Sequence, residues 1–359
     1  MKICFYINKL GDGGAERVIA NLANSLSFDH EIVVINSFRH EAEYPLSEKV
    51  RHVYIDNNAF KSTIRKNFHR ISFLRSFLKK EKPDVAISFM REPNFRLLLA
   101  SFGLKTKVIV SCRNDPRKEY KGFVGRLIVK TLFPLAKGYV FQTEEAKQWF
   151  SKKIQNKSSV ILNAVKDDFF AVDYNGEKSG IVSVGRLTKQ KNHRLLISAY
   201  AKISPFIQDK LVIYGQGELE EELKMFALEC GLQNRVVFAG QIDNVSNIIG
   251  QYKLFVLSSD YEGMPNALME AMAVGLPCIS TDCPCGGPRA IIHNLENGVL
   301  VRVGDKDEMA SSILKIIEDK GLQQRISENA KLFANNEFNS KKIVQKWEEY
   351  ILKIAREGK

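Results

Sequence analysis

Residues 258–289 read SSDYEGMPNALMEAMAVGLPCISTDCPCGGPR, and this stretch decides both the fold and the site. A buried strand is expected to end in the run VLSS, and Gly263 marks the loop that follows it. Residues 267–274 are predicted to be helical, with Asn266 as the capping residue and Gly275 as a stop signal. The next strand follows at once, so the stretch predicts a strand–loop–helix–strand unit of a parallel sheet.

Two carboxylates bracket this unit, Glu262 in the loop and Glu270 in the helix, with seven residues between them. A helix that begins after a parallel strand presents free amides and a positive dipole end, so its start at Asn266, Ala267 and Leu268 favours an anion. Glu262 precedes that start and can face neutral hydroxyls. Glu270, about one turn inside the helix, can reach a hydroxyl at the ligand's other end. This describes a site for a sugar nucleotide, which has phosphates in the middle and a polyol at each side.

The pattern E-x7-E, with EGMPNALMEAMAVGLPCIS around it, resembles the donor-binding motif of retaining glycosyltransferases of glycosyltransferase family 4. The alternative for a bare E-x7-E is a solvated helix with two unrelated surface glutamates. The resemblance covers essentially the whole chain and implies an α/β fold of the GT-B type. In that architecture two Rossmann-like, doubly wound parallel-sheet domains face each other across a cleft, with the donor bound mainly to the second.

A chain of 359 residues is long enough for two domains. Strand-like runs alternate with helical segments, which predicts mostly parallel, doubly wound sheets. We assign residues 1–165 to an acceptor-side domain, completed by a C-terminal helix at 339–359. Residues 166–178 are assigned to a linker, and residues 179–338 to the domain that binds the donor nucleotide.

The loop GRLTKQKN carries Arg186 and, five residues later, Lys191, and it resembles the family's second motif. Both cations can reach one diphosphate, the arginine as a flat fork and the lysine as a point charge. They are expected, with the helix start near Asn266, to stabilise the negative charge that grows on the leaving phosphate, so no metal is needed. We assign Arg186, Lys191 and Glu262 to catalysis, and expect Glu262 to hold sugar hydroxyls and Glu270 the ribose.

Four further residues are expected to contact the donor. The segment GGAER begins at Gly13 and resembles the family's N-terminal glycine loop, which implies donor contacts at Gly13 and Gly14. A Gly-x-Gly turn at Gly215 is expected to pass near the nucleoside, and Ile242, at a strand end, to touch the base through backbone groups. The glycine spacing is not G-x-G-x-x-G, which argues against a dinucleotide cofactor. No cofactor is expected, since the UDP-sugar is a substrate.

The loop after the strand at 107–111 begins Cys112-Arg113-Asn114. Loops after the carboxyl ends of parallel strands line ligand clefts, so Arg113 and Asn114 are the candidates for binding the acceptor. Many relatives carry a histidine in this loop and this sequence does not, which puts a role for an imidazole in doubt.

The charge is unevenly placed. Residues 1–165 hold 29 Lys and Arg against 15 Asp and Glu, a net charge of +14, whereas the remainder has a net charge of −2. The first half should therefore meet an anionic partner, the alternative being a surface that only confers solubility.

Two stretches of this half combine basic and apolar residues. Residues 60–82 have a helical stripe of Ile64, Phe68, Ile71, Leu74 and Leu78. The basic positions between them are Lys61, Arg65, Lys66, Arg70, Arg75, Lys79 and Lys80. Residues 122–138 form the second stretch. Each can lie on an anionic bilayer surface, or can be an ordinary core-packed helix with a solvated basic face.

No stretch approaches 18 uncharged apolar residues, and the six cysteines lack zinc-ligand spacing. We therefore expect a cytoplasmic protein, peripheral at the inner face of the cell membrane. The expected function is retaining, metal-independent transfer of a hexose or N-acetylhexosamine from a UDP-sugar to a polyprenyl-diphosphate-linked saccharide, in bacterial surface polysaccharide or glycan synthesis.

Two other classes stay open. A nucleotide-sugar epimerase or hydrolase of the same architecture would need acid/base side chains in the first domain, where no histidine or clustered carboxylates stand out. A non-catalytic sugar-nucleotide-binding protein is the other class. Nucleic acid is not an expected partner, because no helix-turn-helix, zinc finger or RNP-like sequence accompanies the basic residues.

Overall fold

The chain folds into two compact units, unit 1 with Met1–Asn163 and Lys341–Lys359, and unit 2 with Ala164–Ser340. The computed structural model describes residues 1–11, 13–56, 62–174, 176–242 and 244–357. The division falls close to residue 165, where the sequence analysis ended the first domain.

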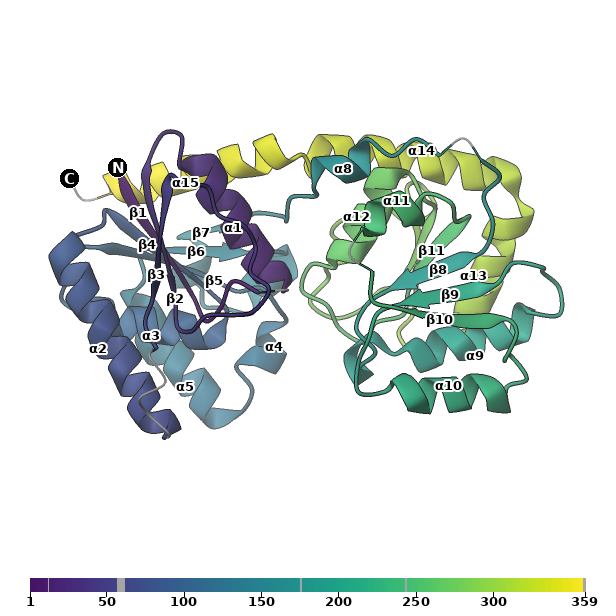
Figure 1. Cartoon of the computed structure of the whole chain (residues 1–359), viewed down its shortest axis with the longest axis horizontal. Helices are drawn as coiled ribbons and strands as arrows, with labels where there is room; N and C mark the ends of the chain where they lie inside the picture. Colours follow the sequence, from purple (N-terminus) through teal and green to yellow (C-terminus); the bar gives the residue numbers. More distant parts are fainter. Residues whose placement is uncertain (12, 57–61, 175, 243, 358–359) are drawn as a thin grey trace. The chain divides into compact units, whose positions relative to one another are not determined.

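Unit 1 is built on a seven-stranded parallel sheet in the order β3-β2-β1-β4-β5-β6-β7 (Figure 1). The strands are β1 (Lys2–Ile7), β2 (Glu31–Asn36), β3 (Val50–Tyr54), β4 (Val85–Phe89), β5 (Lys107–Ser111), β6 (Gly138–Phe141) and β7 (Ser158–Val160). The central strands are apolar and buried on both faces, as a parallel sheet covered by helices on both sides requires.

Helices cover both faces of this sheet. They are α1 (Gly14–Leu26), α2 (Thr63–Glu81), α3 (Arg91–Ser101), α4 (Pro116–Glu119), α5 (Gly122–Leu132), α6 (Glu144–Gln148), α7 (Lys152–Gln155) and α15 (Ser340–Arg356), with a 3₁₀ turn at Phe133–Leu135. Helix α3 packs against both α2 and α5.

The C-terminal helix α15 packs on unit 1 through one apolar stripe. Trp347 is fully buried and stacks on Phe89 of β4 at 5.5 Å between ring centroids. The Tyr350 hydroxyl accepts a hydrogen bond from the Tyr139 backbone N–H (2.8 Å) and donates to the Lys157 carbonyl (2.6 Å). These bonds join α15 to the β6–β7 side of the sheet.

Unit 2 is built on a six-stranded parallel sheet in the order β10-β9-β8-β11-β12-β13. The strands are β8 (Ile181–Val184), β9 (Leu211–Tyr214), β10 (Val236–Gly240), β11 (Leu254–Leu257), β12 (Cys278–Thr281) and β13 (Val299–Val301). The helices are α8 (Asp167–Phe170), α9 (His193–Ile203), α10 (Glu220–Glu229), α11 (Val245–Ile249), α12 (Asn266–Val274), α13 (Lys306–Glu318) and α14 (Lys320–Glu337), with a 3₁₀ turn at Lys189–Lys191.

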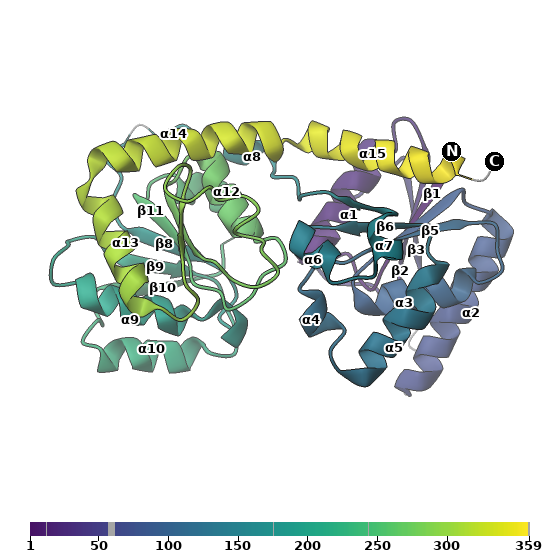
Figure 2. The ribbon, with the colours of Figure 1, turned by 180° about the vertical axis from the view of Figure 1, so that it is seen from behind.

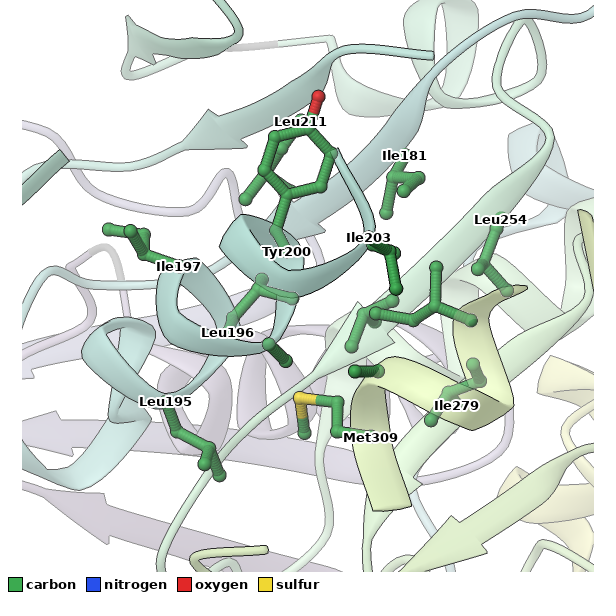
Figure 3. Close-up of a cluster of buried hydrophobic side chains, with 14 of the residues drawn as sticks. Ile181, Leu195, Leu196, Ile197, Tyr200, Ile203, Leu211, Leu254, Ile279 and Met309 are labelled. Carbon is green, nitrogen blue, oxygen red and sulfur yellow. The ribbon is translucent and has the colours of Figure 1, made fainter. Parts of the chain in front are cut away.

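The helices of unit 2 form two groups. Helix α9 packs with α10 and α13, whereas α12 packs with α8, α11 and α14, and Figures 1 and 2 show the two groups on opposite faces of the sheet. Figure 3 shows Leu196 and Tyr200 of α9 against Ile181 and Leu254 of the sheet, in one continuous buried cluster. The predicted doubly wound parallel sheets are thus confirmed in both units.

Two details differ from the sequence analysis. The edge strand β3 was not predicted, because its polar, half-exposed sequence VRHVY lacks an apolar run. The assigned linker contains α8, whose Phe169 is buried and which packs on α12, so this segment lies within unit 2.

Candidate active site

The candidate site lies where two neighbouring strands of unit 2 end. Strand β8 pairs with β11, so the loops that follow them, residues 185–192 and 258–265, leave the same edge of the sheet side by side. The carboxyl edge of a parallel sheet is where ligands bind in doubly wound folds.

Hydrogen bonds join the C-terminal end of the first loop to the second loop. The Asp260 N–H donates to the Gln190 carbonyl (2.9 Å), and the Ser258 hydroxyl donates to the Lys191 carbonyl (2.9 Å). The Asn192 amide donates to the Asp260 carboxylate (2.7 Å). Asn192 also adopts a left-handed conformation and caps α9, so the C-terminal end of the first loop is fixed.

An ion pair closes this arrangement. Lys191 Nζ lies 2.5 Å from Glu262 Oε1, and only 15% and 7% of the two side chains are exposed. The same carboxylate oxygen accepts from the Ser259 hydroxyl (2.7 Å), and Glu262 Oε2 lies 3.5 Å from the Gln190 amide. Two residues expected to meet the ligand separately therefore bind each other, with Ser259 and Gln190 as supports that the sequence analysis did not single out.

Arg186 supplies a second cation to the same edge. It is exposed, and in the described part of the chain its guanidinium has no hydrogen-bond or ion-pair partner. The loop after β8 therefore offers one paired cation at Lys191 and two exposed cations, Arg186 and Lys189, without a hydrogen-bond or ion-pair partner among the described residues.

Gly215 allows the backbones at the ends of β8 and β9 to approach each other closely. It has φ +139°, and a Cβ built on it would lie 2.0 Å from the Gly185 carbonyl oxygen, so a side chain cannot stand there. The Gly215 N–H donates to the Gly240 carbonyl (2.8 Å) and the Gly185 N–H donates to the Tyr214 carbonyl (2.9 Å). Ile242 is half-buried just after this edge.

The first turn of α12 differs from the prediction. Asn266 is the first helical residue, and the capping position belongs to Pro265, which makes no side-chain capping bond. The predicted capping role of Asn266 is therefore wrong, because proline already sets the extended entry to the helix. The Leu268 N–H donates to the Pro265 carbonyl (3.1 Å), whereas that of Ala267 has no acceptor within the described chain.

Glu270 lies one turn into α12, and only 6% of it is exposed. A nearby loop approaches the same region closely, since a Cβ on Gly287 would lie 2.0 Å from the Gly263 carbonyl oxygen. The predicted residues Arg186, Lys191, Gly215, Ile242, Glu262, Asn266, Ala267, Leu268 and Glu270 thus all belong to the carboxyl edge of the unit 2 sheet or the first turns of α12.

The other predicted residues belong to unit 1. Gly13 caps α1 and Gly14 begins it, and Asp12 of the same turn lies outside the described residues. A Cβ on Gly13 would lie 2.0 Å from Glu16 Oε2, so the buried Glu16 carboxylate folds back over this glycine.

Arg113 and Asn114 follow β5 at the carboxyl edge of the unit 1 sheet. The Arg113 guanidinium lies 4.6 Å over the Phe89 ring and donates from Nη2 to Asn163. Its Nε and Nη1 are buried and have no hydrogen-bond partner among the residues that the structure describes, and burial lowers the pKa of Arg113 to about 9. The Asn114 side chain accepts from the Asp115 N–H (2.9 Å), which fixes the start of the loop.

A carboxyl group that the sequence analysis missed lies in the next turn. Asp115 caps α4 by accepting from the Arg117 N–H (2.9 Å), and Glu119 ends the same helix. Burial raises the pKa of Glu119 to about 7, and Arg91 opposes the rise. The sequence analysis did not single out this residue, because the burial that raises the pKa of Glu119 cannot be read from the letters PRKEY.

Two arginines of the basic helix α2 turn inward. Arg70 forms a two-pronged ion pair with Asp56, and both side chains are 11% exposed. Arg75 donates to the Ala100 carbonyl (3.0 Å) and the Phe102 carbonyl (2.7 Å) at the end of α3. The basic face of α2 is thus smaller than predicted, and Lys61 lies outside the described residues.

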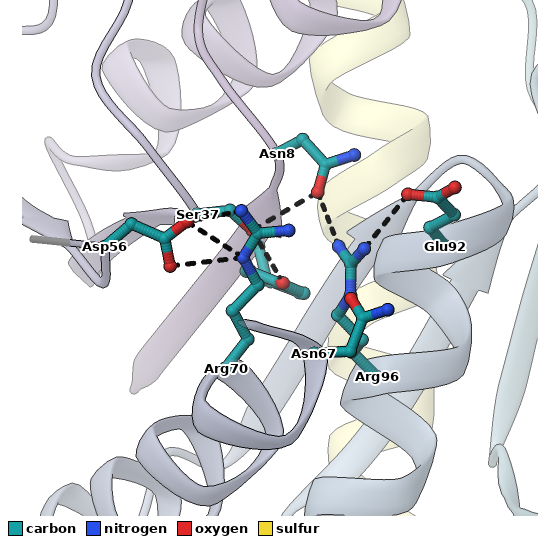
Figure 4. Close-up of polar contacts among 8 residues, drawn as sticks. Asn8, Ser37, Asp56, Asn67, Arg70, Glu92 and Arg96 are labelled. Atoms are coloured by element: carbon teal, nitrogen blue, oxygen red, sulfur yellow. Dashed lines mark hydrogen bonds and ion pairs between the residues drawn. The ribbon is translucent and has the colours of Figure 1, made fainter. Parts of the chain in front are cut away.

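A polar network holds α2 and α3 against the strand ends of unit 1 (Figure 4). Arg96 of α3 donates to Asn8 after β1 (2.6 Å), to Asn67 of α2 (3.0 Å) and to Glu92 (3.0 Å). The Ser37 hydroxyl donates to the same Asn8 oxygen at 3.2 Å. This network gives the N-terminal half of α2 a fixed position on the sheet.

The apolar stripe of α2 is buried only in its second half. Leu74 and Leu78 lie in the core, whereas Ile64 and Phe68 are 80% and 77% exposed. On α5, Phe123, Val124 and Leu127 are also exposed. We call these five exposed apolar residues the α2–α5 surface, and the first turns of the two helices lie at the same end of unit 1 (Figures 1 and 2).

No helix in the described ranges is long and apolar enough to cross a membrane. Within the same ranges, no group of three or more His, Cys, Asp or Glu side chains is arranged to hold a metal ion.

Comparison with known families gives one match for each half of the chain. Residues 12–169 match the family described as Glycosyltransferase Family 4, and residues 165–333 match the family described as Glycosyl transferases group 1.

Curated relatives match over all or part of the chain. An α-1,4-N-acetyl-D-galactosaminyltransferase of Campylobacter jejuni, named for GalNAc-α-(1→4)-GalNAc-α-(1→3)-diNAcBac-PP-undecaprenol, is 28% identical over 99% of both chains. An Escherichia coli enzyme named UDP-Gal:α-D-GlcNAc-diphosphoundecaprenol α-1,3-galactosyltransferase is 34% identical over 45% of this chain and 42% of its own.

Among solved structures, HepE of Anabaena in complex with UDP and glucose superposes with a TM-score of 0.84 at 18% identity, covering 98% of this chain and 99% of that one. Sucrose-phosphate synthase of Thermosynechococcus elongatus gives 0.82 at 16% identity, over 98% of each chain. The predicted fold class, two Rossmann-like domains of the GT-B type, is confirmed.

The Lys191–Glu262 pair can be tested by a double-mutant cycle on unit 2. Glu262→Ala removes a carboxylate that accepts charge-assisted bonds, so we expect the opening free energy of β8 and β11 to fall by about 1.5–3 kcal/mol. In the Glu262→Ala background, Lys191→Met should lower the opening free energy by less than it does in the wild-type protein. The difference between the two effects is the coupling energy, which we expect to be about 1–3 kcal/mol. Native-state hydrogen exchange at amides of the two strands measures both quantities.

The matched control is Lys189→Met, which removes an exposed cation from the same loop. It should show no coupling to Glu262→Ala. Strictly additive effects of Glu262→Ala and Lys191→Met would mean that the pair does not hold the two loops together.

Proposed function

Since the chain belongs to the glycosyltransferases that join a Family 4 domain to a group 1 domain, we propose that it transfers a hexose or N-acetylhexosamine from a UDP-sugar to a polyprenyl-diphosphate-linked saccharide. The observation that carries this proposal is the joined pair of loops in unit 2, with two cations, a buried carboxylate and an uncapped helix start at one sheet edge. The reaction retains the anomeric configuration and serves bacterial surface polysaccharide or glycan synthesis.

The donor diphosphate binds between the loop after β8 and the first turn of α12. Arg186 has no competing partner in the described chain, Lys191 is nearby, and the Ala267 N–H is an unused donor at a positive helix end. Glu270, one turn further, accepts from the ribose, while Gly215 and Ile242 leave room for the nucleoside.

The chemical step follows from where charge develops. The bond between sugar C1 and the β-phosphate oxygen of UDP breaks, and the acceptor hydroxyl oxygen bonds to C1 on the same face. The hydroxyl proton passes to the leaving phosphate oxygen. Arg186 and Lys191 stabilise the negative charge on that phosphate, and stabilisation of this kind usually contributes more to catalysis than any other single effect.

In this step the Lys191 ammonium changes its partner from Glu262 to the donor diphosphate. When UDP-sugar binds, the diphosphate competes with Glu262 for the ammonium, and the carboxylate becomes available to the donor sugar hydroxyls. Ser259 and Gln190 keep Glu262 oriented during the exchange, because they bond to its two oxygens. A buried carboxylate held in this way is pre-organised for neutral donors.

The acceptor is proposed from the relatives and from the charge of the first half. Two curated relatives are named for undecaprenyl-diphosphate-linked saccharides. Residues 1–165 carry a net charge of +14, which suits a diphosphate and an anionic membrane. Arg113 and Asn114, at the carboxyl edge of unit 1, remain the proposed acceptor residues.

Attachment at the inner face of the cell membrane fits the α2–α5 surface. Ile64 and Phe68 lie beside Arg65 and Lys66, and such a mixture of exposed apolar and basic residues is typical of helices that lie in the membrane interface. The proposal concerns reversible attachment, with no spanning segment involved.

The test of the function is product analysis. Purified protein is incubated with a panel of UDP-sugars and a polyprenyl-diphosphate-linked saccharide, and the products are examined by mass spectrometry and NMR. We expect one added sugar mass on the lipid and an α-linkage. A nucleotide-sugar epimerase or hydrolase, for which Glu119 could supply the proton, would instead give an epimerised or free sugar without lipid product.

The carboxylates can be tested separately. Glu262→Ala and Glu270→Ala each remove a charged acceptor of donor hydrogen bonds, so kcat/KM for the UDP-sugar should fall by about 10- to 150-fold, the equivalent of 1.5–3 kcal/mol. Glu296→Ala, an exposed carboxylate in the same unit, is the control. Full activity at subsaturating donor in either variant would remove that residue from the site.

Metal independence is the second property to test. Because Arg186, Lys191 and the α12 amides neutralise the diphosphate, initial rates should be unchanged by EDTA. Loss of activity in EDTA that Mg²⁺ or Mn²⁺ restores would contradict this part of the mechanism.

Membrane attachment is tested by co-sedimentation with vesicles of phosphatidylcholine alone or with added phosphatidylglycerol. Binding should rise with anionic lipid and fall with salt. Arg65→Glu with Lys66→Glu should weaken it by about 30-fold or more, since each basic residue contributes about 1 kcal/mol. Arg70 is left intact, because its ion pair is internal.

The matched control is Lys79→Glu with Lys80→Glu, which reverses two charges at the other end of α2. The neighbouring Leu74 and Leu78 are buried there. These positions lie more than the roughly 8 Å screening length from the first turn. Equal loss in both pairs, or no binding by the wild type, would contradict docking through the α2–α5 surface.

A further inference from the structure

A basic pocket lies beside α5 in unit 1. It has a volume of about 370 Å³ and is lined by Arg117, Tyr120, Lys121, Gly122, Arg126 and Trp149. Three of the six lining residues are cations and none is acidic. The volume corresponds to that of about a dozen water molecules, which is room for two linked phosphate groups.

The charge of this pocket is largely uncompensated. Arg117 pairs with Glu145 at 2.8 Å, on a side chain that is half exposed. Lys121 and Arg126 are exposed, and within the described ranges neither has a carboxylate or hydrogen-bond partner for its cationic group. A concave site with two unpaired cations and a third at its rim has the chemistry of a diphosphate site.

The pocket lies near the proposed acceptor residues of unit 1. Helix α4 follows β5, and Trp149 directly follows α6, which comes after β6. Strands β5 and β6 are neighbours, so the pocket lies near the carboxyl edge of the unit 1 sheet, as do Arg113 and Asn114. A saccharide attached to a group in the pocket can therefore extend along that edge.

The apolar residues of α5 lie next to the pocket. Phe123, Val124 and Leu127 are 81%, 64% and 45% exposed, and they alternate in sequence with the lining residues Gly122 and Arg126. A ligand with its phosphates in the pocket would have its lipid chain beside this apolar face. Exposed apolar patches next to a polar site mark contact with a lipid or a protein.

We propose that the α4–α5 pocket binds the diphosphate of the polyprenyl-diphosphate acceptor. This inference rests on the proposed function and adds to it the place where the acceptor's anionic group is held. Lys121 and Arg126 contact the phosphate oxygens, Arg117 completes the pocket at its rim, and Tyr120 and Trp149 form its apolar wall. The phosphate of a membrane phospholipid has similar chemistry, so the experiment separates the two sources.

Trp149 provides a direct binding signal. The chain has two tryptophans, and the other, Trp347, is fully buried in α15 packing. Titration with farnesyl diphosphate should change tryptophan fluorescence, whereas farnesol should not. Lys121→Ala with Arg126→Ala should weaken the affinity for farnesyl diphosphate by at least about tenfold.

The charge-matched control is Lys152→Ala with Lys153→Ala, two exposed lysines of α7 outside the pocket. It should leave the affinity unchanged. Equal loss in the two double variants would show attraction by overall charge and would overturn the proposal, as would the absence of any response to farnesyl diphosphate. Equally tight binding of phosphatidylglycerol at the same residues would assign the pocket to the membrane surface and overturn it too.

The second readout is turnover in neutral detergent, where no anionic lipid is present. The pocket variant should raise KM for the lipid-linked acceptor by at least about tenfold, and leave KM for the UDP-sugar unchanged. An unchanged acceptor KM in that variant would overturn the proposal. If instead the wild type transfers no sugar to any lipid-linked acceptor, the proposed function fails, and the diphosphate titration still decides whether the pocket binds the group.

Discussion

The ion pair between Lys191 and Glu262 is the interaction on which the candidate site depends. Its partners lie 71 residues apart in the chain and meet only because β8 and β11 are adjacent in the parallel sheet. Burial makes the pair costly to break, since either charge left alone would lack both water and a partner. Together with the hydrogen bonds between the loops, the pair therefore holds the two loops side by side.

Much of this site could be predicted from the sequence because its signals are local. Gly215 and the run from Glu262 to Glu270 each carry turn or helix chemistry within a few residues. The mutual bonding of Lys191 and Glu262, and the support from Gln190, could not be predicted, because each depends on strand order and burial. The capping role given to Asn266 failed since a preceding proline decided the helix entry.

In the first half of the chain, the sequence likewise does not show which basic residues are exposed and which are paired inside the protein. A count of basic residues treats Arg65 and Arg70 alike, yet Arg65 is exposed and Arg70 is internal, paired to Asp56. Helical spacing likewise puts Phe68 and Leu78 on one stripe, although only Leu78 reaches the core. After these corrections, exposed cations and exposed apolar side chains still occur together near the starts of α2 and α5, which is a narrower surface than the sequence indicated.

The central claim is that the joined loops of unit 2 bind the diphosphate of the donor, and a crystal structure with UDP tests it most directly. We expect the phosphates to contact Arg186, Lys191 and the Ala267 N–H, with the ribose hydroxyls at Glu270 and the Lys191–Glu262 distance increased. UDP bound away from the carboxyl ends of β8 and β11, or bound there with its phosphates touching neither cation, would contradict the claim.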